Sequence, residues 1–98
     1  MKTKFSITGR IIFVETCDEN DYNAHLYDYS IFIHIDGRKV VGIDGSTKPL
    51  NTIARRIIFM ISSNFNTSLD SEDLDFIKQN LMSNRDGNEY NVSFTIEF

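Results

Sequence analysis

Three side chains in this sequence are of the types that serve as nucleophile and general base in covalent catalysis: Cys17, His25 and His34. A thiol becomes a strong nucleophile when an imidazole within hydrogen-bonding reach takes its proton. No recognisable motif surrounds these residues, and one cysteine with two histidines does not define a site. We therefore expect no catalytic residue, and we interpret His34 as an exposed histidine on a strand.

Two short segments resemble binding sites for phosphate or metal. Residues 42–48 supply the glycines, hydroxyl groups and lysine of a phosphate-binding loop, but they miss the P-loop spacing, and Pro49 follows directly. Asp18, Asn20 and Asp21 lack the glycine and final glutamate of a calcium-binding loop. We interpret residues 42–48 as a strand-to-helix turn and expect neither a metal site nor a cofactor.

Charge is distributed unevenly along the chain. Residues 15–28 contain five acids and no lysine or arginine, whereas residues 37–56 contain five basic side chains and one acid. Acids steer a basic partner and tyrosines anchor it, so the acidic segment has the composition of a protein-binding loop. The residues assigned to partner binding are Glu15, Asp18, Glu19, Asp21, Tyr22, Tyr27 and Asp28. A solvated acidic loop without a partner and a functional surface on the basic stretch 38–56 are the alternatives.

The alternation of apolar and polar side chains predicts four strands. They run from Lys4 to Glu15, from Tyr29 to Ile35, from Arg38 to Asp44 and from Tyr90 to Phe98. The acidic segment then becomes a loop of roughly thirteen residues between the first two strands, which is longer than most connections.

A turn signal, Asp36-Gly37, joins the second and third strands as a hairpin. A two-residue turn would send the apolar side chains of the third strand to the face opposite those of the second. We therefore prefer a three-residue loop at 35–37, with Gly37 in the left-handed conformation, which pairs Ile31 with Val41.

Two segments between the third and last strands carry apolar side chains at helical spacing. The first begins within residues 46–49 and continues to Phe65, and further apolar side chains at 58–60 indicate burial on more than one side. The second can be capped by Asp70 or Ser71, and its acidic first turn suits the positive end of a helix dipole.

These elements predict one α+β domain spanning residues 1–98, with the element order β-β-β-α-α-β. We expect a two-layer sandwich, in which a helical hairpin covers one face of a four-stranded antiparallel sheet. Two antiparallel helices return the chain to the end of the sheet where the third strand finished, so the last strand adds beside the first. The expected sheet order is fourth, first, second, third.

The face of this sheet that the helices leave open is expected to carry apolar side chains. A candidate interface on this face comprises Ile12, Val14, Phe32, His34 and Val40. Either a loop covers these side chains or they meet another chain, because exposed apolar patches on small domains often mark interaction sites. We therefore expect a homodimer or a partner-covered surface.

Composition limits the class of protein. The 98 residues are 41% hydrophobic and 24% charged, as in a globular domain, and the net charge of −4 argues against binding to nucleic acid. The longest apolar run, residues 57–61, is too short to cross a membrane. A single cysteine excludes an intramolecular disulfide, and the first residues lack the pattern of a secretory signal, so we expect a cytoplasmic protein.

Residues 88–94, Asn-Glu-Tyr-Asn-Val-Ser-Phe, resemble the closing strand of the immunity proteins that neutralise bacteriocin nucleases. The resemblance covers seven residues, and the two predicted helices depart from that family's mostly β pattern, so no binding residue is carried over. The wider type, which includes the immunity proteins of contact-dependent inhibition systems, consists of small acidic cytoplasmic domains whose loops bind a basic toxin. The resemblance implies a bacterial or phage protein with a protein partner.

The sequence thus favours a non-enzymatic protein-binding module, an immunity or inhibitor protein that neutralises a toxin or enzyme through its acidic, tyrosine-bearing loop. A small phosphate- or metal-handling enzyme built around Asp36, Asp44, Ser46 and Lys48 is one alternative. A homo-oligomeric phage or accessory structural subunit, joined through the open sheet face, is another.

Overall fold

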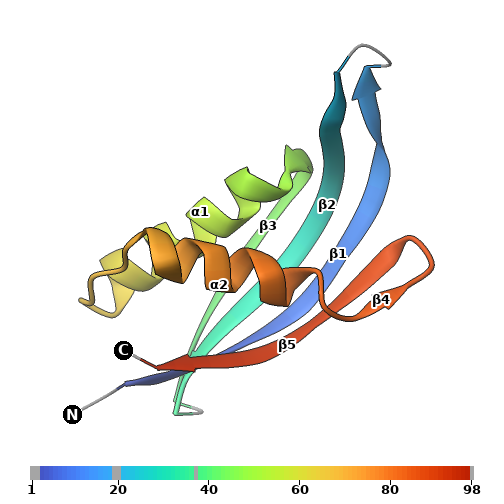
Figure 1. The fold of residues 1–98 in the computed structure, drawn as a ribbon. Coiled ribbons are helices and arrows are strands. Elements are labelled where there is room, and N and C mark those ends of the chain that lie inside the picture. Colours follow the sequence, from blue (N-terminus) through green and yellow to red (C-terminus); the bar gives the residue numbers. More distant parts are fainter. Residues whose placement is uncertain (1–2, 19–20, 37, 98) are drawn as a thin grey trace.

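The computed structural model describes residues 3–18, 21–36 and 38–97, with only the backbone described for residues 15–18, 21–24 and 39. Its elements are, in chain order, β1 (Lys4–Asp18), β2 (Asp21–Ile35), β3 (Lys39–Pro49), α1 (Leu50–Asn64), α2 (Ser71–Leu81), β4 (Arg85–Asp86) and β5 (Glu89–Glu97). The strands form one antiparallel sheet in the order β3-β2-β1-β5-β4, and both helices lie against the same face of it (Figure 1).

The α+β class, the antiparallel sheet and the placement of the last long strand beside the first agree with the sequence prediction. The sheet has five strands and not the predicted four, because Arg85 and Asp86 form the short strand β4 beside the start of β5. A two-residue strand contains no alternation of side chains, and sequence patterning therefore cannot reveal it.

The acidic segment, residues 15–28, is not the predicted loop. β1 continues to Asp18, β2 already begins at Asp21, and these two residues are paired across the hairpin. Polar side chains hid the strands from a search for alternation, but the two backbones satisfy each other's hydrogen bonds whatever the side chains are. The segment is therefore the far end of a long β-hairpin.

This hairpin extends beyond the rest of the sheet (Figure 1). On one side, the last pair with β5 joins Ile12 to Glu89; on the other, the last pair with β3 joins Leu26 to Pro49. The extension contributes to an elongated shape, with principal dimensions of 47 × 24 × 20 Å.

The β2–β3 loop has three residues, as predicted, but it comprises residues 36–38, one position further along the chain. Ile31 consequently pairs with Ile43 and not with Val41. The pairing differs from the prediction by two residues, so every side chain stays on its predicted face. Gly37, for which we predicted a left-handed conformation, lies outside the described residues.

The start of α2 is held by a reciprocal capping box. The Asp70 carboxylate accepts hydrogen bonds from the N–H groups of Glu72 and Asp73 at 3.0 and 3.1 Å. The Asp73 carboxylate accepts one from the Asp70 N–H at 2.9 Å. The predicted cap at Asp70 is thereby confirmed, and such a cap is typically worth about 1 kcal/mol.

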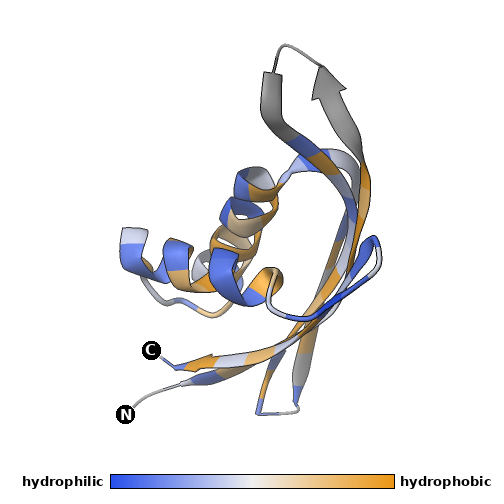
Figure 2. Cartoon of the chain, turned by 45° about the vertical axis from the view of Figure 1, so that its right-hand side comes forward, coloured by the Kyte–Doolittle hydropathy of each residue, from blue (hydrophilic) through white to orange (hydrophobic). Residues whose placement is uncertain are grey.

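The core lies between the inner face of the sheet and the facing sides of both helices (Figure 2). Its buried side chains are Phe5, Ile7, Ile11, Tyr27, Tyr29, Ile31, Ile33, Ile43, Ile53, Ala54, Ile57, Ile61, Ile77, Leu81, Tyr90, Val92 and Ile96. Of the side chains at 58–60 that were expected to widen the buried surface of α1, Ile58 and Met60 pack partly against the core, whereas Phe59 is 65% exposed. Neither helix in the described part of the chain has the length and apolar character needed to span a membrane.

Gly9 lies in the middle of β1, paired with Ile31 of β2 and with Val92 of β5. Its φ of 140° is in the range that side-chain-bearing residues rarely adopt. A Cβ atom at this position would overlap the Ser30 carbonyl oxygen and lie 2.9 Å from the Ile31 Cα. The close approach of β1 and β2 therefore requires glycine.

We predict that Gly9→Ala lowers the free energy of unfolding by about 2–4 kcal/mol, because it combines a strained φ with a backbone clash. Gly87→Ala is the matched control: Gly87 has a φ of 66°, but a Cβ there would meet nothing within 4 Å. The control should lose only about 1 kcal/mol, the strain of the left-handed conformation. Urea unfolding of both variants checks this, and equal losses would contradict it.

Candidate protein-binding surfaces

The predicted acidic residues are mostly carried by the protruding hairpin. The structure places the backbones of Glu15, Asp18, Asp21 and Tyr22 on its two strands, whereas Glu19 lies outside the described residues. Four of the seven residues assigned to partner binding thus belong to one protruding element.

The other two, Tyr27 and Asp28, have structural contacts at the base of the hairpin. Tyr27 is 5% exposed, and its ring centroid lies 5.7 Å from that of Phe13 and 6.2 Å from that of Tyr90. The Asp28 carboxylate accepts a hydrogen bond from the Thr47 N–H at 2.9 Å, where the register between β2 and β3 shifts. The structure therefore places Tyr27 in the core and not on an exposed loop.

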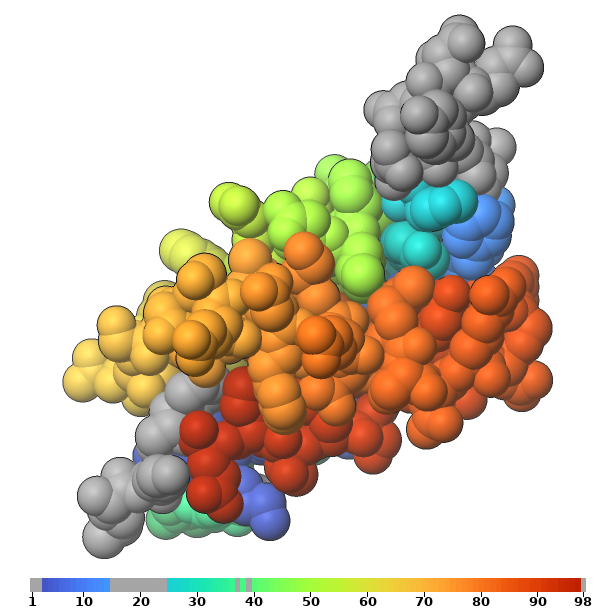
Figure 3. All heavy atoms as spheres, in the orientation of Figure 1, coloured from blue at the N-terminus to red at the C-terminus, as the bar shows by residue number. Residues whose placement is uncertain are grey.

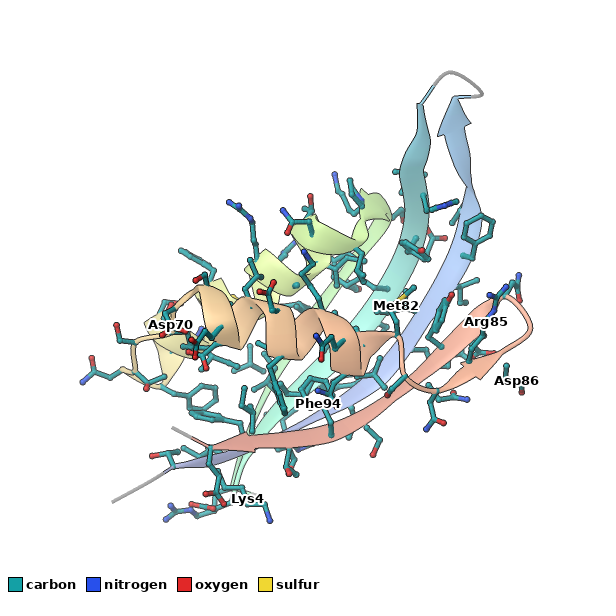
Figure 4. The ribbon with its side chains drawn as sticks, in the orientation of Figure 1. Lys4, Asp70, Met82, Arg85, Asp86 and Phe94 are labelled. Carbon is teal, nitrogen blue, oxygen red and sulfur yellow. The ribbon has the colours of Figure 1, made fainter. Side chains whose placement is uncertain are left out.

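A cavity of about 280 Å³ opens beside Tyr27. Its lining residues are Phe13, His25, Tyr27, Arg85 and Tyr90. The Arg85 guanidinium carbon lies 5.8 Å from the Tyr90 ring centroid, and the Arg85 Nε–H donates a hydrogen bond to the Gly87 carbonyl at 2.8 Å. Figure 4 labels Arg85 at the β4–β5 hairpin, so this cavity lies where that hairpin meets the base of the long one.

A second cavity, of about 300 Å³, shares His25 and Tyr27 with the first. It extends to the start of α1 and to Lys78 of α2. Together the two cavities form a concave surface at the base of the hairpin, with aromatic walls and the cations Arg85 and Lys78 among its lining residues. Such a surface can receive a side chain of a protein partner.

The pKa of Tyr27 is raised above its ordinary value of 10.0. Burial is the main cause, because it disfavours the phenolate; the neighbouring Tyr90 adds to the shift, and Arg85 opposes it. Tyr27 therefore stays protonated at neutral pH, and its hydroxyl acts there as a neutral hydrogen-bonding group.

The open face of the sheet presents the predicted apolar patch. Val14, Phe32 and Val40 are 41%, 43% and 54% exposed, while Ile12 and His34 are half-buried. The described side chains thus leave most of the patch accessible to solvent. The exposure of Phe32 and Val40 follows from the alternation along β2 and β3, whereas Val14 lies at a β-bulge between Phe13 and Glu15, where the alternation along β1 is interrupted.

The basic stretch 38–56 does not form one surface. Arg38 lies in the β2–β3 loop, where its guanidinium is 3.5 Å from the Asp36 carboxylate. Arg56 lies on α1 and donates a hydrogen bond to the Tyr29 hydroxyl at 3.1 Å, so it helps to hold the helix on the sheet.

The residues of the alternative enzyme site are also separated. Asp36 precedes β3, Asp44 lies near its middle, and Ser46 and Lys48 lie toward its far end. Among the side chains that the structure describes, no three His, Cys, Asp or Glu residues gather closely enough to hold a metal ion.

Sequence reasoning missed the cavity beside Tyr27. Phe13, Tyr27 and Tyr90 all belong to the inward-facing rows of their strands, which is the signal that could have grouped them. Their proximity depends on Phe13 pairing with Tyr27, and Tyr27 lies in the segment that was predicted as loop.

Comparison of the chain with models of protein families, with curated proteins and with solved structures gave no match. The functional interpretation is therefore drawn from the surfaces described above.

We predict that ionisation of the Tyr27 phenol contributes to a loss of folding stability in alkaline solution. Its raised pKa means that the unfolded chain releases the phenolic proton first, so the free energy of unfolding should decrease as the pH rises above 10.0. Tyr27→Phe removes the titrating hydroxyl and should make this decrease shallower. Urea unfolding of both proteins between neutral and alkaline pH checks this, and parallel curves would contradict it.

Proposed function

We propose that this protein is a non-enzymatic protein-binding module, of the immunity or inhibitor type, that binds a basic toxin or enzyme through its β1–β2 hairpin. The observation that supports this is the protruding hairpin. β1 and β2 are each 15 residues long, and their far ends stay paired with each other beyond the rest of the sheet. Two paired strands are more rigid than the loop predicted from the sequence, so less conformational entropy is lost when a partner binds.

The two parts of this surface have different roles in the proposal. The acids of residues 15–28 attract a basic partner at long range and raise the rate of encounter. The cavity at the base of the hairpin, walled by Phe13 and Tyr90, receives a side chain of the docked partner and slows its release. The positive charge of Arg85 directs an acidic or aromatic side chain, and not a cationic one, into this cavity.

We predict that replacing Asp18, Glu19 and Asp21 together by serine slows association by about tenfold at low salt and leaves dissociation nearly unchanged. The partner is first isolated by co-purification from the native host, and kinetics are then measured at two salt concentrations. In the same assay, Tyr22→Ala should accelerate dissociation about thirtyfold, which corresponds to the roughly 2 kcal/mol typical of an aromatic anchor.

The matched control replaces Asp36, Asp44 and Asp86, which lie outside the hairpin, by serine with the same change in net charge. This control should associate at close to the normal rate. If it slows association as much as the hairpin variant, net charge and not the hairpin governs encounter. Tyr27→Ala is unsuitable for this test, because truncation of a buried ring would disturb the core.

A second candidate function, a homo-oligomeric subunit, is supported by the exposure of Phe32 and Val40 on the open sheet face. Face-to-face packing of two sheets would bury this patch, as in a β-sandwich. The hairpin and the open face are different surfaces, so a dimer and a bound partner are compatible.

We predict that the protein sediments as a dimer at high concentration and that Phe32→Ser with Val40→Glu makes it a monomer. The double variant removes exposed apolar area without disturbing the buried side of the sheet, so its urea unfolding midpoint serves as the control. A normal protein that stays monomeric at the highest concentration would remove this candidate.

A further inference from the structure

The outer edge of β5 is only partly occupied. β4 pairs with Glu89 and Tyr90, and the N–H of the next residue, Asn91, donates a hydrogen bond to the Asn84 carbonyl at 2.9 Å. From Val92 onward, the described residues provide a pairing partner on the β1 side alone. Most of β5 is therefore an edge strand.

The direction of the β5 backbone groups follows from two hydrogen bonds. The Asn88 carbonyl accepts from the Phe13 N–H and so points toward β1, whereas the Asn91 N–H points away from β1. Because residues of a strand direct their N–H and C=O groups alternately to the two sides, Ser93, Thr95 and Glu97 direct both groups to the free edge.

The two edges of the sheet differ in how they are protected. β3, the opposite edge, contains Gly42, Gly45, Lys48 and Pro49, which are residue types that discourage the pairing of another strand. The stretch 92–96 of β5 contains no glycine, proline or lysine. Its sequence, Val-Ser-Phe-Thr-Ile, is instead rich in residues that favour strands.

A groove of about 380 Å³ lies between the start of α2 and the end of this edge. Its lining residues are Glu72, Asp73, Phe76, Thr95, Ile96 and Glu97. Phe76 is 42% exposed and packs edge-on against Phe94, with ring centroids 6.2 Å apart. Figure 3 shows α2 lying above β5 on the front of the molecule, and Figure 4 places Phe94 between them.

The groove is acidic. Its lining contains three carboxylates, those of Glu72, Asp73 and Glu97, and no basic side chain. The Asp73 carboxylate is held in place by the Asp70 N–H at 2.9 Å. Lys4 is the cross-strand neighbour of Glu97, but it lies on the β1 side and does not line the groove. Charge complementarity thus favours a basic occupant.

We infer that this groove binds an extended basic segment of another protein, which adds as a strand to the free edge of β5. Backbone hydrogen bonds to Ser93 and Thr95 would supply affinity, and an apolar side chain packed on Phe76 would supply specificity. Lysine or arginine side chains of the segment would pair with the carboxylates of Glu72 and Glu97.

A second copy of this chain fits the edge less well than a basic segment does. The strand that a second copy would add, Glu89–Glu97, contains two glutamates and no lysine or arginine, so it cannot complement the acidic groove. The groove is also separate from the β1–β2 hairpin, so the inference does not depend on the proposed function.

The test uses the peptide acetyl-Lys-Val-Lys-Val-Lys-Val-Lys-amide and the intact protein. Binding is followed by fluorescence anisotropy, and strand addition is followed by amide hydrogen exchange measured by NMR. We expect a dissociation constant of about 100 μM. On binding, hydrogen exchange of the Ser93 and Thr95 amides should become at least about tenfold slower. The Phe94 amide already pairs with β1 and should change little.

Two variants separate the parts of the interaction. Thr95→Pro removes an N–H that points to the free edge, a position where a strand tolerates proline, and should abolish binding. Glu72→Lys with Glu97→Lys should weaken binding by about tenfold. The matched control for this reversal, Asp44→Lys with Asp86→Lys, makes the same change in net charge at two exposed acids that do not line the groove, and it should bind normally. If Thr95→Pro fails to fold, the charge variants and the exchange data still decide.

Four results would overturn the inference. One is no binding up to about 1 mM peptide. Another is binding without protection of the Ser93 and Thr95 amides, which would place the peptide elsewhere. The third is protection of these amides in the free protein that is lost on dilution, which would show that a second copy occupies the edge. The fourth is that a control peptide with glutamate in place of lysine binds as tightly as the lysine peptide, which would exclude charge complementarity as the basis of binding.

Discussion

The pairing of β1 with neighbours on both sides is the constraint on which the rest of the structure depends. From Phe5 to Ile12, β1 lies between β2 and β5, and beyond that point it is paired with β2 alone. The first half holds the sheet together and presents the face that α1 and α2 cover (Figure 2). The second half forms the protruding hairpin. One continuous strand therefore connects the rigid body to the surface proposed to meet a partner, and Gly9 permits the close approach of strands at its centre.

Alternation of side chains along the strands gives the sheet two apolar surfaces, one that the helices bury and one that stays exposed. In the inward row, Phe5, Ile7 and Ile11 are completely buried by the helices. The outward row includes Phe32 and Val40, and the chain supplies nothing among its described residues to cover them. A single two-layer domain of this size has helices for one face of its sheet only. Apolar side chains on the second face thus belong to a surface that the fold itself does not need.

The parts predicted correctly from the sequence are those in which a local pattern is repeated. The alternation from Tyr90 to Ile96 defined the last strand, and the Asp70 cap defined the start of the second helix. The parts that were missed depend on pairing with distant residues. The far ends of β1 and β2 have no apolar row long enough to detect. β4 is a strand only because Arg85 and Asp86 pair with β5. Tyr27 is buried because its ring packs against those of Phe13 and Tyr90. The cavity and the free edge of β5 follow from that pairing, so they too required the structure.

The position of β5 also affects the order in which the chain can fold. Lys4 pairs with Glu97, so the central strand acquires its second neighbour from the opposite end of the described sequence (Figure 1). During synthesis, the β1–β2 hairpin can form early, but one side of β1 stays open until β5 has left the ribosome. Contacts between residues so far apart in sequence carry a large loop-closure entropy and slow the folding of small domains. Closure of the core is therefore a late step, and the nascent chain exposes a central strand to unwanted pairing until that step is complete.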